Sequence, residues 1–287
     1  MKHPSHRDHC LTAEHDGAFL ADGFGAQYTG KMSALAFASF RNWSYCHRPF
    51  SEIGHNASAA ECEAATGLAL LHNARSREDC SSCTRCMRNR NCWEEVQKAI
   101  SAGGSFADIF SGPVLANLRE AYFSARTRTR PGAPSLLRQP DGRTSIAVHI
   151  RRGDVDWRSR ARFVKEQTFV TLMDALASWS TWSLPPHFHI VSEGVPSAFP
   201  LLAARKDTTL HLNAPMLDSF HALVTADALV FGRSSFANAA AYLRGGAGKS
   251  PRVYYLPGDG WGFTKNLKGW HKCDVKSHGA TCAALKG

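Results

Sequence analysis

Two arginines that follow an apolar segment are the residues of this chain best suited to chemistry. Residues 146–150 are apolar except for His149, and the sequence Arg-Arg-Gly-Asp follows at 151–154. A short apolar segment that ends near a glycine is typical of a buried strand. Ligands of open α/β sheets bind beyond the carboxyl ends of strands, and a guanidinium suits a phosphate. The segment predicts a phosphate site at Arg151, although a surface arginine cluster explains it equally well.

A serine pair at a second expected strand end offers backbone and hydroxyl donors. Residues 228–231 are apolar, and a helix is predicted to begin near Ser234, soon after Gly232. Backbone N–H groups at a helix start, together with the hydroxyls of Ser234 and Ser235, form an anion site. Taken alone, Ser234 is better explained as the N-cap of the helix.

A glycine loop near the N-terminus shows a similar arrangement. Gly23, Gly25 and Gln27 form a G-x-G-x-Q sequence between a short apolar run at 18–21 and a helical pattern at 32–40. A strand, a glycine loop and a helix in this order bring backbone N–H groups close to a phosphate. A tight turn without a ligand explains the same sequence.

The elements that must position these groups alternate regularly in the second half of the chain. This alternation predicts an α/β fold with a parallel, doubly wound sheet and right-handed crossovers. Amphipathic helices are expected between strands at 146–150, 188–191, 208–212, 228–231 and 252–256.

Composition and breakers divide the chain into five expected regions. The first residues are polar and rich in histidine. The segment after 126 contains many proline and glycine residues, and its apolar residues show no regular spacing. We expect a disordered N-terminus at 1–16, an N-terminal α/β domain with a cysteine-rich insertion at 17–125, a linker at 126–144, a C-terminal α/β domain at 145–257 and a basic tail at 258–287.

Composition also limits the classes of partner. The 287 residues are 44% hydrophobic and 20% charged, as in ordinary globular proteins, and the net charge of +10 favours anionic partners such as phosphorylated substrates. The basic residues are dispersed and no base-stacking motif is present, so we expect no nucleic-acid binding. No apolar stretch reaches the length of a membrane span, and the N-terminus lacks the apolar core of a signal peptide.

The nine cysteines leave two interpretations open. Four of them, spaced as C-x-x-C-x-x-C-x5-C, are Cys80, Cys83, Cys86 and Cys92. Such clusters bind zinc in some proteins and form disulfides in oxidising compartments. The cluster is too compressed for a zinc ribbon with two distant cysteine pairs, which favours disulfides. Cys273 and Cys282 flank a short loop and suit a local bridge.

Three blocks with this chemistry occur in order along the chain. They are G-x-G-x-Q at 23–27, H-x-R-R-G-D at 149–154 and A-D-x-L-V-x-x-x-S-S-F at 226–236. Together they resemble the GDP-fucose fucosyltransferase superfamily, which includes α-1,2-, α-1,6- and protein O-fucosyltransferases. The segment 45–50, with His55, is similar to uncharacterised algal and bacterial relatives.

The resemblance implies an inverting, GT-B-like glycosyltransferase with two Rossmann-type domains and parallel sheets, of which the C-terminal domain is the clearer one. GDP-fucose would lie in the cleft, mostly against the C-terminal domain, and a glycan or glycoprotein hydroxyl would accept the sugar. Arg151 would hold the β-phosphate and stabilise the departing GDP. The other substrate-binding residues would be His149 and Asp218 at guanine, Ser234, Ser235 and Phe236 at the phosphates and nucleotide, and Gly23, Gly25 and Gln27 over the diphosphate.

Arg152 belongs to the same substrate-binding block. Strand alternation points it away from Arg151 and toward a pair with Asp154 or Asp156. Asp154 is the predicted catalytic carboxylate, with Asp156 and Glu193 as alternatives for the general base. A largely dissociative reaction, or an inactive protein, would need no base.

The remaining expectations concern cofactors, class and location. Asp154 and Asp156 imitate a D-x-D metal motif, but the preceding arginines compete for them, so we expect no metal cofactor. The alternatives to an enzyme are an inactive nucleotide- or glycan-binding protein and, less favoured, a zinc-dependent interaction module. The chemistry and the sequons at 42–44 and 56–58 suggest the Golgi lumen or secretory pathway if a leader is missing, and the cytoplasm otherwise.

Overall fold

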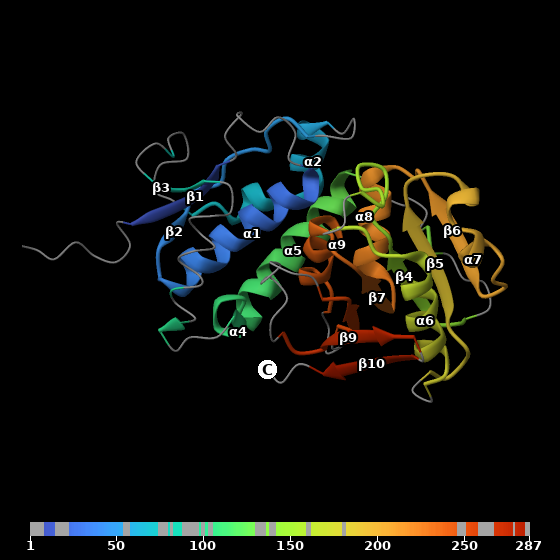
Figure 1. Cartoon of the computed structure of the whole chain (residues 1–287). Helices are drawn as coiled ribbons and strands as arrows, with labels where there is room; N and C mark the ends of the chain where they lie inside the picture. The colour runs from blue at the N-terminus through green and yellow to red at the C-terminus, as the bar shows by residue number, and fades with distance from the viewer. Residues whose placement is uncertain are drawn as a thin grey trace, which may run out of the picture. The chain divides into compact units, whose positions relative to one another are not determined.

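The chain forms two compact units, Met1–Ala133 and Pro134–Gly287 (Figure 1). Each unit contains a parallel sheet and helices, which confirms the α/β class with parallel sheets predicted from the sequence. The structure is a computed structural model. It describes residues 9–14, 23–53, 58–73, 80, 83–87, 98, 101–102, 106–129, 136–137, 142–158, 162–179, 182–245, 251–257, 267–277 and 279–284.

A largely buried helix organises the first unit. Helix α1 (Phe24–Phe40) packs against β1 (Cys10–Glu14) and β2 (Ser44–Tyr45), and β1 is the middle strand of a parallel sheet with β2 and β3 (Thr84–Met87). Helix α1 also contacts α4 (Phe106–Ile109) and α5 (Gly112–Thr129). Helix α5 in turn packs against α2 (Ala59–Thr66) and the 3-10 helix η2 (Leu68–Leu71).

A seven-stranded sheet forms the centre of the second unit, with strand order β10-β9-β8-β7-β4-β5-β6. Every neighbouring pair is parallel except β9 and β10, which are antiparallel and lie side by side in Figure 1. The strands are β4 (Ser145–His149), β5 (His187–Ser192), β6 (Thr208–Leu212), β7 (Ala228–Phe231), β8 (Val253–Tyr255), β9 (Trp270–Lys276) and β10 (Gly279–Ala284).

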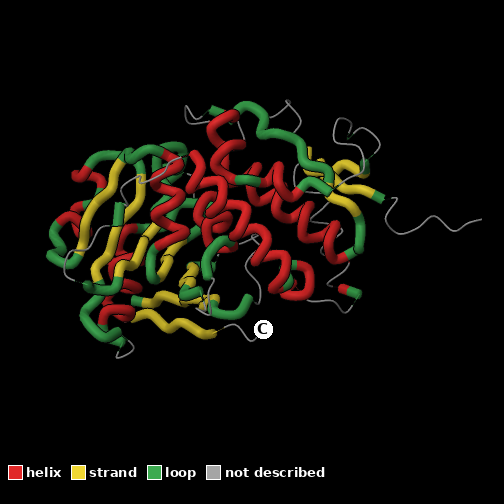
Figure 2. Tube along the Cα trace, turned by 180° about the vertical axis from the view of Figure 1, so that it is seen from behind, coloured by secondary structure: helices red, strands yellow, loops and turns green. Residues whose placement is uncertain are grey.

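Helices cover both faces of this sheet. Side chains at alternate positions of β4 point to opposite faces. Ile146, Val148 and Ile150 share a core with the apolar face of α6 (Glu166–Ala177), which contains Phe169, Leu172, Met173 and Leu176 as predicted. Helix α7 (Pro200–Ala203), after the 3-10 helix η3 (Pro196–Ala198), contacts α6. Helices α8 (Met216–Thr225) and α9 (Ser235–Tyr242) pack on β4, β7 and each other (Figure 2).

The order of the strands creates a switch point beside β4. From β4 the chain adds β5 and then β6 on one side, and it later adds β7 and then β8 on the other. The loops that leave β4 and β7 therefore turn toward opposite faces of the sheet, and the carboxyl ends of strands at such a switch point are where open α/β sheets generally bind ligands.

Four expectations about the chain's organisation are wrong in detail. Residues 10–14 form β1 inside the segment expected to be disordered, and residues 270–276 and 279–284 of the expected tail form β9 and β10 of the large sheet. Helix α1 already begins at Phe24, so Gly25 and Gln27 lie in the helix rather than in a loop before it. The apolar run at 18–21 lies outside the described residues, and α5 extends to Thr129, into the expected linker.

Two cysteines of the compressed cluster form disulfides and are therefore not zinc ligands. Cys83 is bonded to Cys10 and Cys80 to Cys46, which ties the start of β3 and its preceding loop to β1 and β2. The expected local bridge between Cys273 and Cys282 is confirmed and joins β9 to β10. The side chains of Cys86 and Cys92 lie outside the described part of the chain. Two of the four proposed zinc ligands are therefore already used.

Removal of the Cys10–Cys83 bridge should destabilise the first unit. The bridge closes a loop with a sequence separation of 73, for which chain entropy predicts a loss of about 4 kcal/mol. Urea unfolding of the Cys10→Ser/Cys83→Ser variant, with Cys62→Ser as a control at a buried free thiol, measures this loss. Equal stability of the double variant and the parent, or one zinc per chain in purified protein, would contradict the disulfide assignment.

Candidate functional site

The candidate site lies where β4 ends, at the switch point of the second unit. Ile150 donates its N–H to Val191, and its carbonyl accepts a hydrogen bond of 2.6 Å from the Ser192 hydroxyl. These bonds to β5 hold the backbone immediately before Arg151. The backbone that carries Arg151, the residue expected to bind a phosphate, is therefore held in a fixed position at the carboxyl edge of the sheet.

A tight turn at Gly153 pairs Arg151 with Asp154. The N–H of Asp154 donates to the carbonyl of Arg152, and Gly153 has a φ of 81°, so the three residues form a γ-turn. The turn brings the Asp154 carboxylate back to Arg151, whose Nε and Nη2 donate to its two oxygens at 3.1 and 2.5 Å. The guanidinium is thereby held in one orientation by a bidentate ion pair.

The expected pairing of Arg152 with an aspartate is wrong. Its guanidinium lies 4.2 Å from the centroid of the Phe163 ring and donates to the carbonyls of Arg151 and Val164, each at 2.9 Å. The γ-turn explains the difference, because it returns Asp154 to Arg151 and leaves Arg152 to pack beneath the loop. Arg152 supports the loop that carries Arg151.

The Glu193 carboxylate lies against the same turn. Glu193 follows β5, the parallel neighbour of β4, and a Cβ atom at Gly153 would lie 1.7 Å from its Oε2 atom. The positive φ favours glycine at this position, and any other residue would also displace the Glu193 carboxylate. Both carboxylates are exposed, and that of Asp154 accepts two hydrogen bonds from Arg151. The structure brings one arginine and two carboxylates to this edge.

His149 lies on the face of the sheet covered by α8 and α9. Its ring centroid is 5.6 Å from that of Phe236, which is 5.3 Å from that of Phe220. Burial lowers the pKa of His149 to about 3, with a smaller contribution from the positive charge of Arg151. Its Nδ1 atom is buried and has no hydrogen-bond partner within the described structure. His149 is therefore a neutral imidazole.

The helix starts at this edge supply backbone donors and one carboxylate. Ser234 is the N-cap of α9, and its buried hydroxyl accepts a hydrogen bond from the N–H of Ala237, so the capping interpretation is confirmed. Ser235 and Phe236 form the first turn of α9, and Asp218 lies in the first turn of α8. Because α8 packs on both β4 and α9, these residues gather around the end of β4.

Gln27, expected at the diphosphate, is a packing residue of the first unit in this structure. It is only 1% exposed, its amide donates to the Glu52 carbonyl, and its oxygen accepts from the N–H and hydroxyl of Ser51. Gly25 is buried within α1, and Gly23 is the N-cap residue of that helix. The roles expected for these three residues at a phosphate remain predictions.

A buried polar network that the sequence analysis did not predict fixes the segment 45–50. His47 contacts the Glu63 carboxylate through Nε2 and the Tyr45 hydroxyl through Nδ1. The Lys31 ammonium, on a residue only 2% exposed, donates to the carbonyls of Arg48 and Pro49. Burial lowers the pKa of Lys31 to about 8. A lysine within an otherwise apolar helix pattern was the available signal. His55 lies outside the described residues.

Metal and membrane features can be stated only for the described residues. Among them, no group of three or more histidine, cysteine, aspartate or glutamate side chains could hold a metal ion. In the same residues, no helix combines the length and apolar character needed to cross a bilayer.

Comparisons with known proteins give matches among solved structures. No protein-family model matches the chain, and no significant match is found among curated proteins. A NodZ α-1,6-fucosyltransferase co-crystallised with GDP is 9% identical over 96% of this chain and 99% of its own, with a TM-score of 0.45. POFUT1 in complex with GDP is 13% identical over 85% of this chain and 96% of its own, with a TM-score of 0.40. Arabidopsis thaliana FUT1 in complex with GDP is 12% identical over 90% of this chain and 72% of its own, with a TM-score of 0.41. At these identities the similarity concerns the fold, and no residue's role is taken from it.

Neutral His149 predicts that the second unit loses stability in acid. The folded protein resists protonation of His149 until about pH 3, whereas the unfolded chain binds the proton near pH 6.5, so the free energy of unfolding falls as the pH drops below 6.5. Between pH 7.5 and pH 5.0, the free energy of unfolding measured with urea should fall by about 2 kcal/mol less in His149→Phe than in the parent. His189, whose pKa is lowered to about 4 chiefly by burial, would retain part of the dependence in the variant. Identical pH dependence in both proteins would contradict the assignment.

Proposed function

We propose that this protein is a glycosyltransferase that transfers fucose from GDP-fucose to a hydroxyl of a glycan or glycoprotein, with inversion at the sugar carbon. The observation that carries the proposal is the oriented Arg151 guanidinium beside the start of α9, at the switch point of a parallel sheet. The H-x-R-R-G-D and S-S-F blocks that resemble fucosyltransferases supply these residues. The donor sugar and the inversion rest on that resemblance.

Arg151 would act on the leaving group. As the bond between the sugar carbon and the β-phosphate oxygen breaks, the electron pair leaves with GDP and negative charge accumulates on the phosphate. A guanidinium held in place beforehand stabilises this charge without reorganising, so its effect is largest in the transition state. Backbone N–H groups at the start of α9 would add to the stabilisation.

The nucleotide would contact the face that carries His149. A neutral imidazole can offer one donor and one acceptor to a base, and the nearby aromatic ring of Phe236 can pack against the nucleotide. Asp218 would accept from the guanine N–H groups, as the resemblance implies. Since Arg151 supplies the positive charge at the phosphate, the proposed reaction needs no metal ion.

Glu193 fits the general base better than Asp154. The Asp154 oxygens both accept hydrogen bonds from Arg151, so Asp154 would act as a positioning residue for the guanidinium. The Glu193 carboxylate lies at the same turn and is exposed. It would take the proton of the acceptor hydroxyl while that oxygen bonds to the sugar carbon and GDP departs.

The disulfides support an oxidising compartment for this function. Three pairs are bonded among the described cysteines, and such bonds persist mainly in secretory and extracellular environments. We therefore propose that the protein works in the secretory pathway, where glycan and glycoprotein acceptors are found.

GDP binding tests the phosphate site directly. Isothermal titration should show GDP affinity reduced about tenfold to a hundredfold in Arg151→Ala, the cost of a lost charged hydrogen-bond pair. Arg152→Ala should lose less affinity and more thermal stability, because Arg152 packs on Phe163 and bonds two carbonyls. Equal losses of GDP affinity would contradict the separation of roles, and folded parent protein that binds no GDP would refute the proposed function.

Transfer kinetics separate the two carboxylates. With GDP-fucose and a glycan array as acceptor source, Glu193→Gln should lower kcat by about two to four orders of magnitude with little change in GDP affinity. Asp154→Asn should chiefly raise KM for the donor, because it frees the Arg151 guanidinium, and Asp156→Asn is the matched control in the same loop. A full loss of kcat in Asp154→Asn with an active Glu193→Gln would reverse the assignment. GDP binding without transfer in the parent would indicate a nucleotide-binding protein that has lost catalysis.

A further inference from the structure

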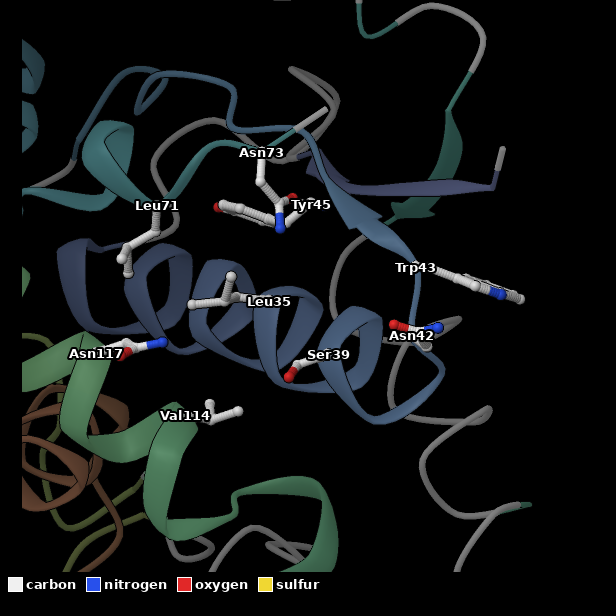
Figure 3. A pocket seen from close by; sticks show the side chains of 9 residues that line it. All are labelled: Leu35, Ser39, Asn42, Trp43, Tyr45, Leu71, Asn73, Val114 and Asn117. Carbon is white, nitrogen blue, oxygen red and sulfur yellow. Dashed lines mark hydrogen bonds between the residues drawn. The ribbon is translucent and has the colours of Figure 1, made fainter. Parts of the chain in front are cut away.

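A small pocket in the first unit is lined by residues to which no role has been given. Its volume is about 210 Å³. Pockets for drug-sized ligands occupy roughly 300–1,000 Å³, so this one suits a ligand of about one ring. It is formed between α1, β2, η2 and α5, and it is lined by Leu35, Ser39, Asn42, Trp43, Tyr45, Leu71, Asn73, Val114 and Asn117 (Figure 3).

The floor of the pocket is apolar and firmly held. Leu35, Tyr45 and Val114 are 9%, 1% and 5% exposed. The N–H of Tyr45 donates to the Asn73 side-chain oxygen, and the N–H of Asn73 donates to the Tyr45 carbonyl. This reciprocal pair fixes β2 to the segment after η2, so the wall does not depend on a ligand.

Neutral polar side chains form the rim. Ser39, Asn42, Asn73 and Asn117 are exposed, and Figure 3 shows Asn117 projecting from α5 toward α1. Apart from the oxygen of Asn73, none of these side-chain groups is hydrogen-bonded to the described part of the protein. Three carboxamides and a hydroxyl can therefore donate to and accept from a ligand.

The lining contains no ionisable acid or base of the Asp, Glu, Lys, Arg or His type, although the chain carries 34 lysines and arginines and a net charge of +10. A pocket for a phosphate or carboxylate would place a cation at the ligand, because a buried charge needs a partner. A purely apolar ligand would leave the amides of the rim without partners. Both observations favour an uncharged ligand with many hydroxyl groups and one apolar face.

We propose that this pocket binds a neutral sugar ring of a glycan. The hydroxyls of a pyranose would exchange hydrogen bonds with Ser39, Asn73 and Asn117, while its C–H face would lie on the side chains of Leu35 and half-buried Leu71. The inference concerns sugar binding by the first unit and does not rest on the proposed transfer reaction. If that reaction is confirmed, the bound sugar belongs to the acceptor.

Saturation-transfer difference NMR with single sugars tests the pocket. The probes are glucose, galactose, mannose, fucose and N-acetylglucosamine, with glucose 6-phosphate as the charged comparison. At least one neutral sugar should bind, and the phosphorylated sugar should not bind in the pocket. Asn117→Leu, which keeps the size of the side chain and removes its hydrogen bonds, should weaken binding about fivefold to tenfold. Ser39→Phe should abolish binding by filling the pocket.

Ala116→Leu is the matched control, because it places the same leucine on α5 at an exposed position outside the lining and should leave binding unchanged. The protein is produced in a host that forms disulfides without N-glycosylation, since a glycan on Asn42 would lie at the rim. GDP titration of each variant should match the parent, which separates failure of this pocket from failure of the phosphate site. No neutral-sugar signal in folded parent, or a signal that persists in both Ser39→Phe and Asn117→Leu, would overturn the proposal.

Discussion

The position at which β4 ends is the constraint on which the candidate site depends. β4 is hydrogen-bonded in parallel to β5 on one side and β7 on the other, and all five of its residues are buried. A strand held in this way cannot shift its register without exposing its apolar side chains. The loop at 151–154 therefore starts from a fixed point, and it does so where the strand order reverses. Position, rather than the arginine itself, distinguishes Arg151 from the other basic residues of a strongly basic chain.

The electrostatics of the site follow from that position. An arginine remains charged under all ordinary conditions, so a guanidinium at a partly covered edge is best accommodated with a counter-charge. Asp154 provides it across the γ-turn, and a bound phosphate would provide a second negative group on the same donors. Burial, with a smaller contribution from Arg151, keeps His149 neutral. Arg151 is thus a positive group whose orientation is set in advance, and such a group stabilises the negative charge of a departing diphosphate without reorganising.

Patterns of local origin were predictable from the sequence, and contacts across long separations were not. The strand at 208–212 and the buried face of α6 follow directly from apolar spacing. β1 was missed because its polar surroundings suggest disorder, whereas its partners come from residues 44–45 and 84–87 and a bridge to Cys83. In β9 the buried residues Trp270 and Cys273 are three positions apart among charged residues, which is not the alternation of a strand, so only pairing with β8 identifies it as part of the sheet. The Arg151–Asp154 pair required a turn whose φ no composition rule specifies.

The two units use their polar groups for different purposes, and this difference limits what each can bind. In the first unit two polar side chains that lie inside are paired within the fold: Lys31 with two backbone carbonyls and His47 with Glu63. These contacts hold the segment that ends at the pocket wall, while the groups that face the pocket are uncharged amides and a hydroxyl. In the second unit the arginine at the strand end keeps a side chain that is 21% exposed and is paired with a carboxylate that is itself 38% exposed. An anionic ligand can replace or share that partner at small desolvation cost, whereas a neutral sugar gains nothing from it. The proposed phosphate site therefore belongs to the second unit, and the proposed site for an uncharged sugar belongs to the first.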